Sequence, residues 1–168
     1  MTTHDRASSA TAIRPASPAD FPFLHAVAGR PEMARFVIDE DDTALAAHLA
    51  DPACRLVIWS PEGRPLGFAL FCEIGNPSGR VELRRLALAE TGRGLGRAFL
   101  AALVRHAFTE LAADRIWLDM ASDNDRAHRV YLAAGFSHEG TLRRHWRRPA
   151  GDVADLLLFG MLRDEWRG

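Results

Sequence analysis

Two residue types, lysine and glutamine, are missing from this chain of 168 residues, and the absence of lysine excludes one class of protein. The chain contains no lysine, because all 21 basic residues are arginine. A nucleotide-hydrolysing P-loop needs the motif G-K-[ST], so this class is excluded. The formal net charge of −1 argues against a nucleic-acid partner, because phosphate binding needs an excess of positive charge. No apolar run is long enough for a transmembrane helix, so we expect no membrane partner.

Cysteine and clustered histidine are also scarce. The two cysteines, Cys54 and Cys72, do not have the spacing of metal ligands, and we expect buried thiols rather than a disulfide. The seven histidines form no H-x-x-x-H or H-E-x-x-H motif, so we expect no metal site. The first residues, MTTHDRASSATA, lack the apolar segment of a signal peptide, which favours a cytoplasmic protein.

The remaining composition, 48% hydrophobic and 26% charged, is typical of a globular protein. We expect residues 1–10 to form a short disordered lead and residues 11–168 to form one domain. Apolar periodicity and turn residues predict the order β-α-α-β-β-β-α-β-α-β-β, a mixed α/β fold. Within it, Asp20 is expected to cap the first helix. In the strand GRVELRRLAL, alternation places Val81, Leu83 and Arg85 on one face, opposite Glu82, Arg84 and Leu86.

A glycine-rich stretch, ETGRGLGRAFL, follows this strand and leads directly into a helix. Backbone N–H groups at the first turn of a helix have no helical partner and can hold a pyrophosphate. The six residues Gly92 to Arg97 would supply these groups, and Arg93 and Arg97 would add charged donors. The glycines alternate and come after several strands, which differs from the G-x-G-x-x-G motif of a dinucleotide-binding fold.

A second motif lies on the next predicted helix, NDRAHRVYLAAGF. Asn124, Ala127, Tyr131 and Gly135 recur at offsets of 3, 7 and 11, which places them along one stripe of a helix. Tyr131 is the only tyrosine of the chain. Taken alone it would be a core tyrosine, but its place after the glycine loop favours a role in the same site.

The two motifs together resemble those of the GNAT superfamily of acyl-CoA-dependent N-acetyltransferases. The resemblance extends from IRPASPAD to LLLFGMLRDEW, and GRGLGRAFL looks like the pyrophosphate loop of the superfamily. It implies a single-domain, mostly antiparallel mixed sheet with splayed central strands and about four flanking helices. One departure is Thr91, which stands where the superfamily has glutamine or arginine.

The resemblance also implies roles for individual residues, with acetyl-CoA as the co-substrate. Backbone groups of Leu86, Ala87 and Leu88 would contact the pantetheine arm, and Asn124 would hydrogen-bond the cofactor. The residues implied to hold the pyrophosphate are Gly92, Arg93, Gly94, Leu95, Gly96 and Arg97. Tyr131 would direct its hydroxyl at the thioester sulfur and act as general acid.

Transfer of an acetyl group to an amine requires removal of a proton, because the amine is an ammonium at neutral pH. Glu82 is the first candidate for the base, and Asp119 is its competitor. A backbone N–H near Leu86 to Leu88 would polarise the carbonyl. Both cysteines lie outside the motifs, so we expect direct transfer rather than an acyl-cysteine.

The acceptor is the least defined part of the site. The acidic run Asp39 to Asp42 would attract a cationic amine, whereas RRHWRRP would attract an anion or protect an edge strand with charge. We expect a small-molecule amine or a peptide N-terminus as acceptor, and a monomer or homodimer. The alternatives are an acyltransferase for another acyl-CoA and a catalytically weak module that binds CoA.

Overall fold

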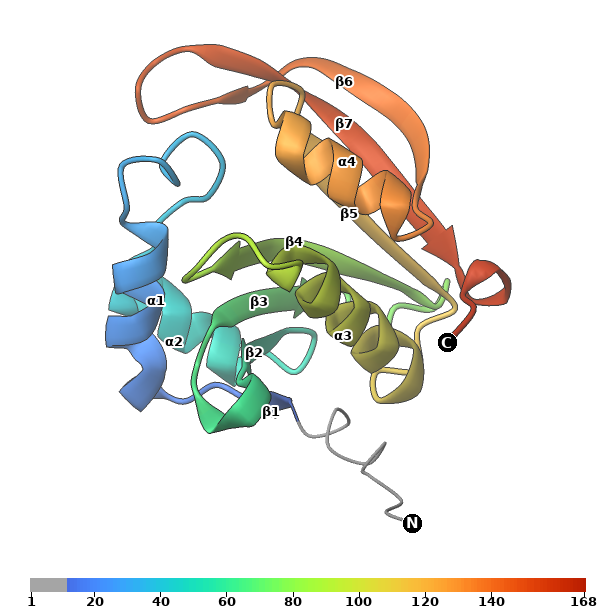
Figure 1. Cartoon of the computed structure of the whole chain (residues 1–168), viewed down its shortest axis with the longest axis horizontal. Helices are drawn as coiled ribbons and strands as arrows, with labels where there is room; N and C mark the ends of the chain where they lie inside the picture. Colours follow the sequence, from blue (N-terminus) through green and yellow to red (C-terminus); the bar gives the residue numbers. More distant parts are fainter. Residues whose placement is uncertain (1–11) are drawn as a thin grey trace.

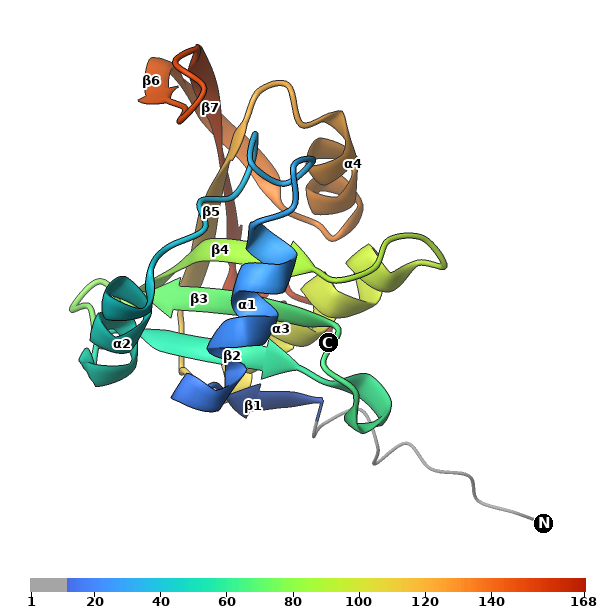
Figure 2. The same cartoon turned by 90° about the vertical axis from the view of Figure 1, so that its left-hand side faces the viewer.

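A seven-stranded sheet with helices on both faces forms the frame of the protein (Figures 1 and 2). The computed structural model describes residues 12–168, and the predicted lead at residues 1–10 lies outside them. The strand order is β1-β2-β3-β4-β5-β7-β6. The strands are β1 (Ile13–Pro15), β2 (Arg55–Trp59), β3 (Gly67–Cys72), β4 (Arg80–Leu88), β5 (Arg115–Ala121), β6 (Ser137–Arg147) and β7 (Val153–Leu162).

In the described part of the chain four α-helices cover this sheet, and the order of helices and strands confirms the predicted one. They are α1 (Phe21–Ala28), α2 (Asp42–Ala50), α3 (Leu95–Thr109) and α4 (Asp125–Ala133). One apolar cluster lies between the sheet and α1 and α2, and a second lies between the sheet and α3 and α4. Among residues 12–168, no helix is both long and apolar enough to cross a membrane.

The sheet opens at its centre, between β4 and β5 (Figure 1). These two strands are parallel and pair only over Arg80 to Glu82, opposite Arg115 to Trp117. Every other pair of neighbouring strands is antiparallel. Beyond Glu82 the backbone of β4 has no strand partner on the side of β5, so its polar groups remain available to a ligand.

A bulge in β4 makes part of the predicted alternation wrong. Leu83 pairs with Phe71 and Arg85 pairs with Leu70, which leaves Arg84 as one extra residue in β4. Such an insertion reverses the face of every later side chain. Arg85 therefore lies on the face of α1 and α2, and Leu86 joins the cluster beneath α3.

The first helix also differs in one detail from the prediction. Asp20 occupies the position before α1 but makes no side-chain capping bond. Its carboxylate instead accepts two hydrogen bonds from the Arg14 guanidinium, at 2.7 and 2.9 Å, and one from the backbone N–H of Ser17. These contacts lower the pKa of Asp20 from 3.8 to about 2, with the Arg14 hydrogen bonds as the largest cause. Asp20 thus fastens β1 to α1.

Candidate active site

The glycine loop lies directly between β4 and α3. Gly92 and Gly94 have φ angles of +98° and +74°, which L side chains rarely adopt. A Cβ atom added at either position would meet no atom within 4 Å, so the space above the loop is open. The sequence needs glycine here for the turn, and the turn leaves its backbone accessible.

Some amides of this loop are free and others are already used. The N–H of Leu95 donates to the Gly92 carbonyl at 3.0 Å, and that of Arg97 donates to Gly94 at 3.1 Å. Among the described residues, no backbone acceptor is found for the N–H groups of Gly94 and Gly96. The arginines of the loop, Arg93 and Arg97, are exposed. Free amides at the N-terminus of a 15-residue helix, with two arginines beside them, fit a pyrophosphate.

Asn124 begins α4, the helix that carries the second motif. Its side-chain oxygen accepts a hydrogen bond from the N–H of Ala127 at 3.1 Å, the usual bond of an N-terminal cap. The carbonyl of the amide is therefore engaged in the helix, while its NH2 group can donate to a ligand.

Tyr131 is buried on the inner face of α4, where its ring packs against Phe136 and Phe159. Among residues 12–168, no hydrogen-bond partner is found for its hydroxyl. Burial is the main cause that raises the pKa of Tyr131, and the negative charge of Asp119 raises it further. The phenol therefore stays protonated across the ordinary pH range, as a proton donor must.

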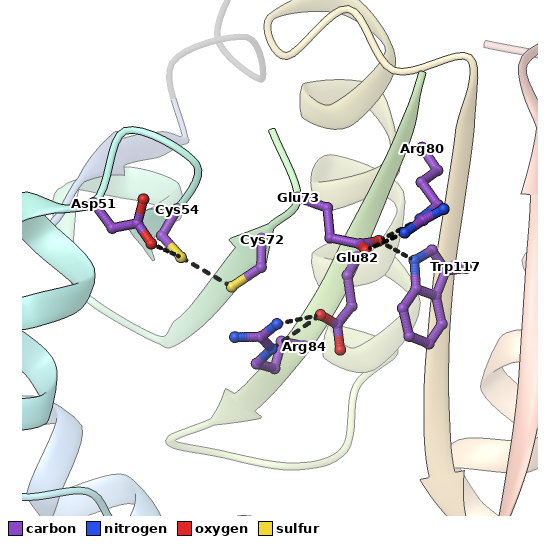
Figure 3. A network of polar contacts seen from close by, with 8 residues as sticks. All are labelled: Asp51, Cys54, Cys72, Glu73, Arg80, Glu82, Arg84 and Trp117. Atoms are coloured by element: carbon purple, nitrogen blue, oxygen red, sulfur yellow. Dashed lines mark hydrogen bonds and ion pairs between the residues drawn. The ribbon is translucent and has the colours of Figure 1, made fainter. Parts of the chain in front are cut away.

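Glu82 lies at the point where β4 and β5 part, and its side chain is 12% exposed. Its Oε2 atom accepts hydrogen bonds from Nε and Nη2 of Arg84, at 2.9 and 2.7 Å (Figure 3). Arg84 is the extra residue of the bulge and contacts a carboxylate only two positions before it. The other carboxylate oxygen, Oε1, remains available to accept a proton.

Asp119 is the second carboxylate of the site and lies on β5. Desolvation is the main cause that raises its pKa, and the negative charge of Glu82 adds to the effect. The nearby His145 and Arg84 side chains oppose the shift. The two predicted bases, Glu82 and Asp119, therefore lie close enough for the charge of one to affect the pKa of the other. Asp119 affects the pKa of Tyr131 in the same way.

The predicted pantetheine-binding segment lies on the open edge of β4. Leu86, Ala87 and Leu88 pair with β3 on one side only. The glycine loop begins directly after this segment, so one path leads from the two carboxylates along β4 to α3.

Both cysteines are buried thiols, as predicted, and lie close together, Cys54 directly before β2 and Cys72 at the end of β3 (Figure 3). Their sulfur atoms are 3.1 Å apart, and the Cys54 thiol donates to Asp51 at 3.6 Å. Burial is the main cause that raises the pKa of Cys72 to about 12.

The two charged runs noted in the sequence are partly neutralised. His25 contacts both Asp39 and Asp42, at 2.7 and 2.8 Å, and these contacts raise its pKa. In the run RRHWRRP, on and just after the edge strand β6, Arg148 is buried and ion-paired, which charge pattern alone did not reveal.

Comparison with known proteins identifies the family of the chain. The family model described as an acetyltransferase (GNAT) domain matches residues 11–137. That match ends before most of β6 and all of β7, so the domain limits of 11–168 stay a prediction.

Two curated relatives are similar over part of the chain. The mycothiol acetyltransferase of Kineococcus radiotolerans is 36% identical over 118 residues, which are 69% of this chain and 37% of that protein. The spermine/spermidine N(1)-acetyltransferase of Bacillus subtilis is 35% identical over 88 residues, 48% of this chain and 58% of that protein. The chain thus matches less than two thirds of the length of either relative.

A solved structure shares the fold. The spermidine N-acetyltransferase from Vibrio cholerae, in complex with CoA and spermine, superposes with a TM-score of 0.82. The two chains are 20% identical, and the superposition covers 93% of this chain and 97% of the other. With the family model, the relatives and the fold in agreement, the chain belongs to the GNAT acetyltransferase family, which confirms the family, the fold and the class of enzyme predicted from its sequence.

Proposed function

We propose that this protein transfers the acetyl group of acetyl-CoA to a primary amine of a small cationic molecule. The observation that carries the proposal is the gap between β4 and β5, which has the glycine loop after β4 and Glu82, Asp119 and Tyr131 around it. Acetyl-CoA supplies the activated acetyl group as a thioester.

The donor would be held along the free edge of β4. Amides of Leu86 to Leu88 would bind the pantetheine arm and polarise the acetyl carbonyl. The amides of Gly94 and Gly96, with Arg93 and Arg97, would hold the pyrophosphate. The open space above the glycines and the unpaired edge support this assignment.

Glu82 would remove the proton from the incoming ammonium. Arg84 holds one oxygen of this carboxylate in place, and the other oxygen is free to accept the proton. Asp119 is the competing base, because desolvation moves its pKa toward neutral pH.

Tyr131 would protonate the leaving thiolate. Its raised pKa keeps the proton on the phenol until the carbon–sulfur bond breaks. The apolar surroundings that raise this pKa would also raise the pKa of the CoA thiol released beside it, so the difference between the two groups need not widen.

Charge on the acceptor side favours a cation. Arg84 and Arg85 are paired with Glu82 and Glu40, which removes their attraction for an anion. Within residues 12–168, Asp39 and Asp42 have His25 as their shared partner. The relative from Bacillus subtilis is named for spermine and spermidine, which supports a polyamine as acceptor.

Release of CoA thiol, measured with acetyl-CoA and a panel of amines, tests the proposal. We expect turnover with spermidine or spermine, and weaker turnover with an uncharged amino sugar or a peptide with a free N-terminus. Binding of CoA without turnover on any amine would instead support a CoA-binding module. Faster turnover with a longer acyl-CoA would show that acetyl-CoA is not the preferred donor.

A further inference from the structure

The connection between α1 and α2, residues 29–41, contacts both sides of the gap between β4 and β5. On the β4 side, Glu40 forms an ion pair with Arg85. On the β5 side, Arg35 donates to Asp123, which lies in the turn between β5 and α4, with 2.5 Å between Nη2 and Oδ2. In Figure 2 the connection rises from α1 in front of the gap. A single segment therefore spans the gap on the face that α1 and α2 cover.

The two attachments of this segment differ in strength. At the β4 end, the side chains of Glu40 and Arg85 are 18% and 19% exposed, and His48 contacts the same carboxylate at 2.9 Å. At the β5 end, the side chains of Arg35 and Asp123 are 63% and 39% exposed. An exposed ion pair contributes little free energy, whereas a partly buried network of charges contributes more. The segment is therefore held more strongly at its β4 end than at its β5 end, where it can be released.

The carboxylate of Asp123, which accepts the hydrogen bond from Arg35, is held by a buried partner. Its other oxygen, Oδ1 of Asp123, accepts from Nη2 of Arg148 at 2.5 Å, and the Arg148 side chain is only 2% exposed. Arg148 also contacts Asp152 at 3.1 Å and lies over the Trp146 ring. Asp123 thus joins the connection between α1 and α2 to the end of the β6–β7 hairpin and to the turn that carries Asn124.

We propose that Asp123 is a positioning residue whose ion pair with Arg35 latches the connection between α1 and α2 across the acceptor side and so sets the affinity for the amine. The inference rests on the proposed function, because it concerns the acceptor of that reaction. An amine bound beside Glu82 lies under this connection, since Glu82 and Arg85 are on the same face of β4. The helix α3, which follows the glycine loop, packs on the opposite face, so the ion pair of the latch lies away from the proposed pyrophosphate site.

The effect follows from the strength of the latch. A surface ion pair contributes up to about 1 kcal/mol, which shifts the balance of latched and released forms by up to about five-fold. If only the latched form holds the amine fully, loss of the pair raises the KM for the amine by that factor. The KM for acetyl-CoA and kcat would stay close to their original values.

The variant that tests this is Arg35→Gln, which releases the connection and leaves the buried pair between Asp123 and Arg148 intact. We expect the KM for the amine to rise by about three- to five-fold, the limit set by a surface pair. Arg35→Lys, which keeps the charge, should restore most of the affinity. Arg126→Gln is the matched control, because Arg126 is exposed on the adjacent helix and has no ion pair among the described residues. An unchanged KM for the amine in Arg35→Gln, or an equal rise for acetyl-CoA, would overturn the inference.

Hydrogen exchange gives a readout that does not depend on catalysis. The amides of Met33, Phe36 and Val37 are hydrogen-bonded within the connection. In Arg35→Gln they should exchange faster than in the original protein, with no change in β2 or β3. Equal exchange in both proteins would refute the latch. If the latch is seen by exchange but no amine is acetylated, the proposed function fails and so does the role of the latch in binding the acceptor.

Discussion

Replacement of Tyr131 by phenylalanine separates chemistry from packing. The ring contacts with Phe136 and Phe159, at centroid distances of 6.0 and 5.7 Å, do not involve the hydroxyl. No hydrogen bond of the hydroxyl is found among residues 12–168, so its removal breaks none there. We therefore expect the free energy of unfolding to change by no more than about 1 kcal/mol.

Turnover should respond much more strongly. A positioned general acid contributes about 100- to 10,000-fold to the rate, so kcat of Tyr131→Phe should fall by at least about 100-fold, or about 2.7 kcal/mol of activation free energy. The affinity for acetyl-CoA should hardly change, because the glycine loop and the edge of β4 remain intact.

Three measurements decide this prediction: the rate of thiol release, the dissociation constant of CoA and the thermal midpoint. Because burial raises the pKa of Tyr131, its deprotonation should not lower the rate of the original enzyme at alkaline pH below about 10, its ordinary value. A Tyr131→Phe variant with unchanged kcat would refute the role of general acid. A fall in rate matched by a fall in thermal midpoint would show a structural role instead.

Three further predictions follow from neighbouring contacts. In Glu82→Gln, loss of turnover should be greatest at low pH, where most of the amine is protonated, and a loss independent of pH would contradict the role of base. Asp20→Asn should lower the free energy of unfolding at pH 7 by about 2 kcal/mol, because the pKa of Asp20 is lowered from 3.8 to about 2. That contribution is present above pH 4 and disappears as the pH falls toward 2, so equal urea midpoints at pH 7 would contradict it. Cys54 and Cys72 should resist iodoacetamide at pH 8 in the folded protein and react in urea, because burial raises the pKa of both thiols; rapid alkylation of the folded protein would contradict it.

Local patterns in the sequence were sufficient to predict the order of elements. The glycine loop and the motif from Asn124 to Gly135 each lie within one turn or one helix, where residue spacing determines geometry. The predicted face of Arg85 was wrong because a single extra residue in β4 leaves the local alternation intact and only strand pairing reveals it. Asp20 stands at the predicted N-cap position of α1, but its carboxylate accepts hydrogen bonds from Arg14 and Ser17 instead of capping the helix.

Contacts between residues far apart in the chain could not be predicted from the sequence. Arg35 and Asp123 are 88 positions apart, and neither belongs to a motif. Arg148 stands in a run of arginines whose other members are exposed, so composition could not distinguish its buried role. The only local hint was the position of Asp123 directly before Asn124.

The short pairing between β4 and β5 also has a mechanical consequence. The sheet consists of two parts, β1 to β4 and β5 to β7, which are joined through only three residue pairs. A change in the angle between these two parts would break few hydrogen bonds. A ligand bound between β4 and β5 would contact both parts of the sheet and fix the angle between them. The connection from α1 to α2 forms ion pairs with both parts of the sheet, so the same angle would determine how far the connection must extend. The distance between the two attachment points of the connection would therefore follow the angle of the sheet.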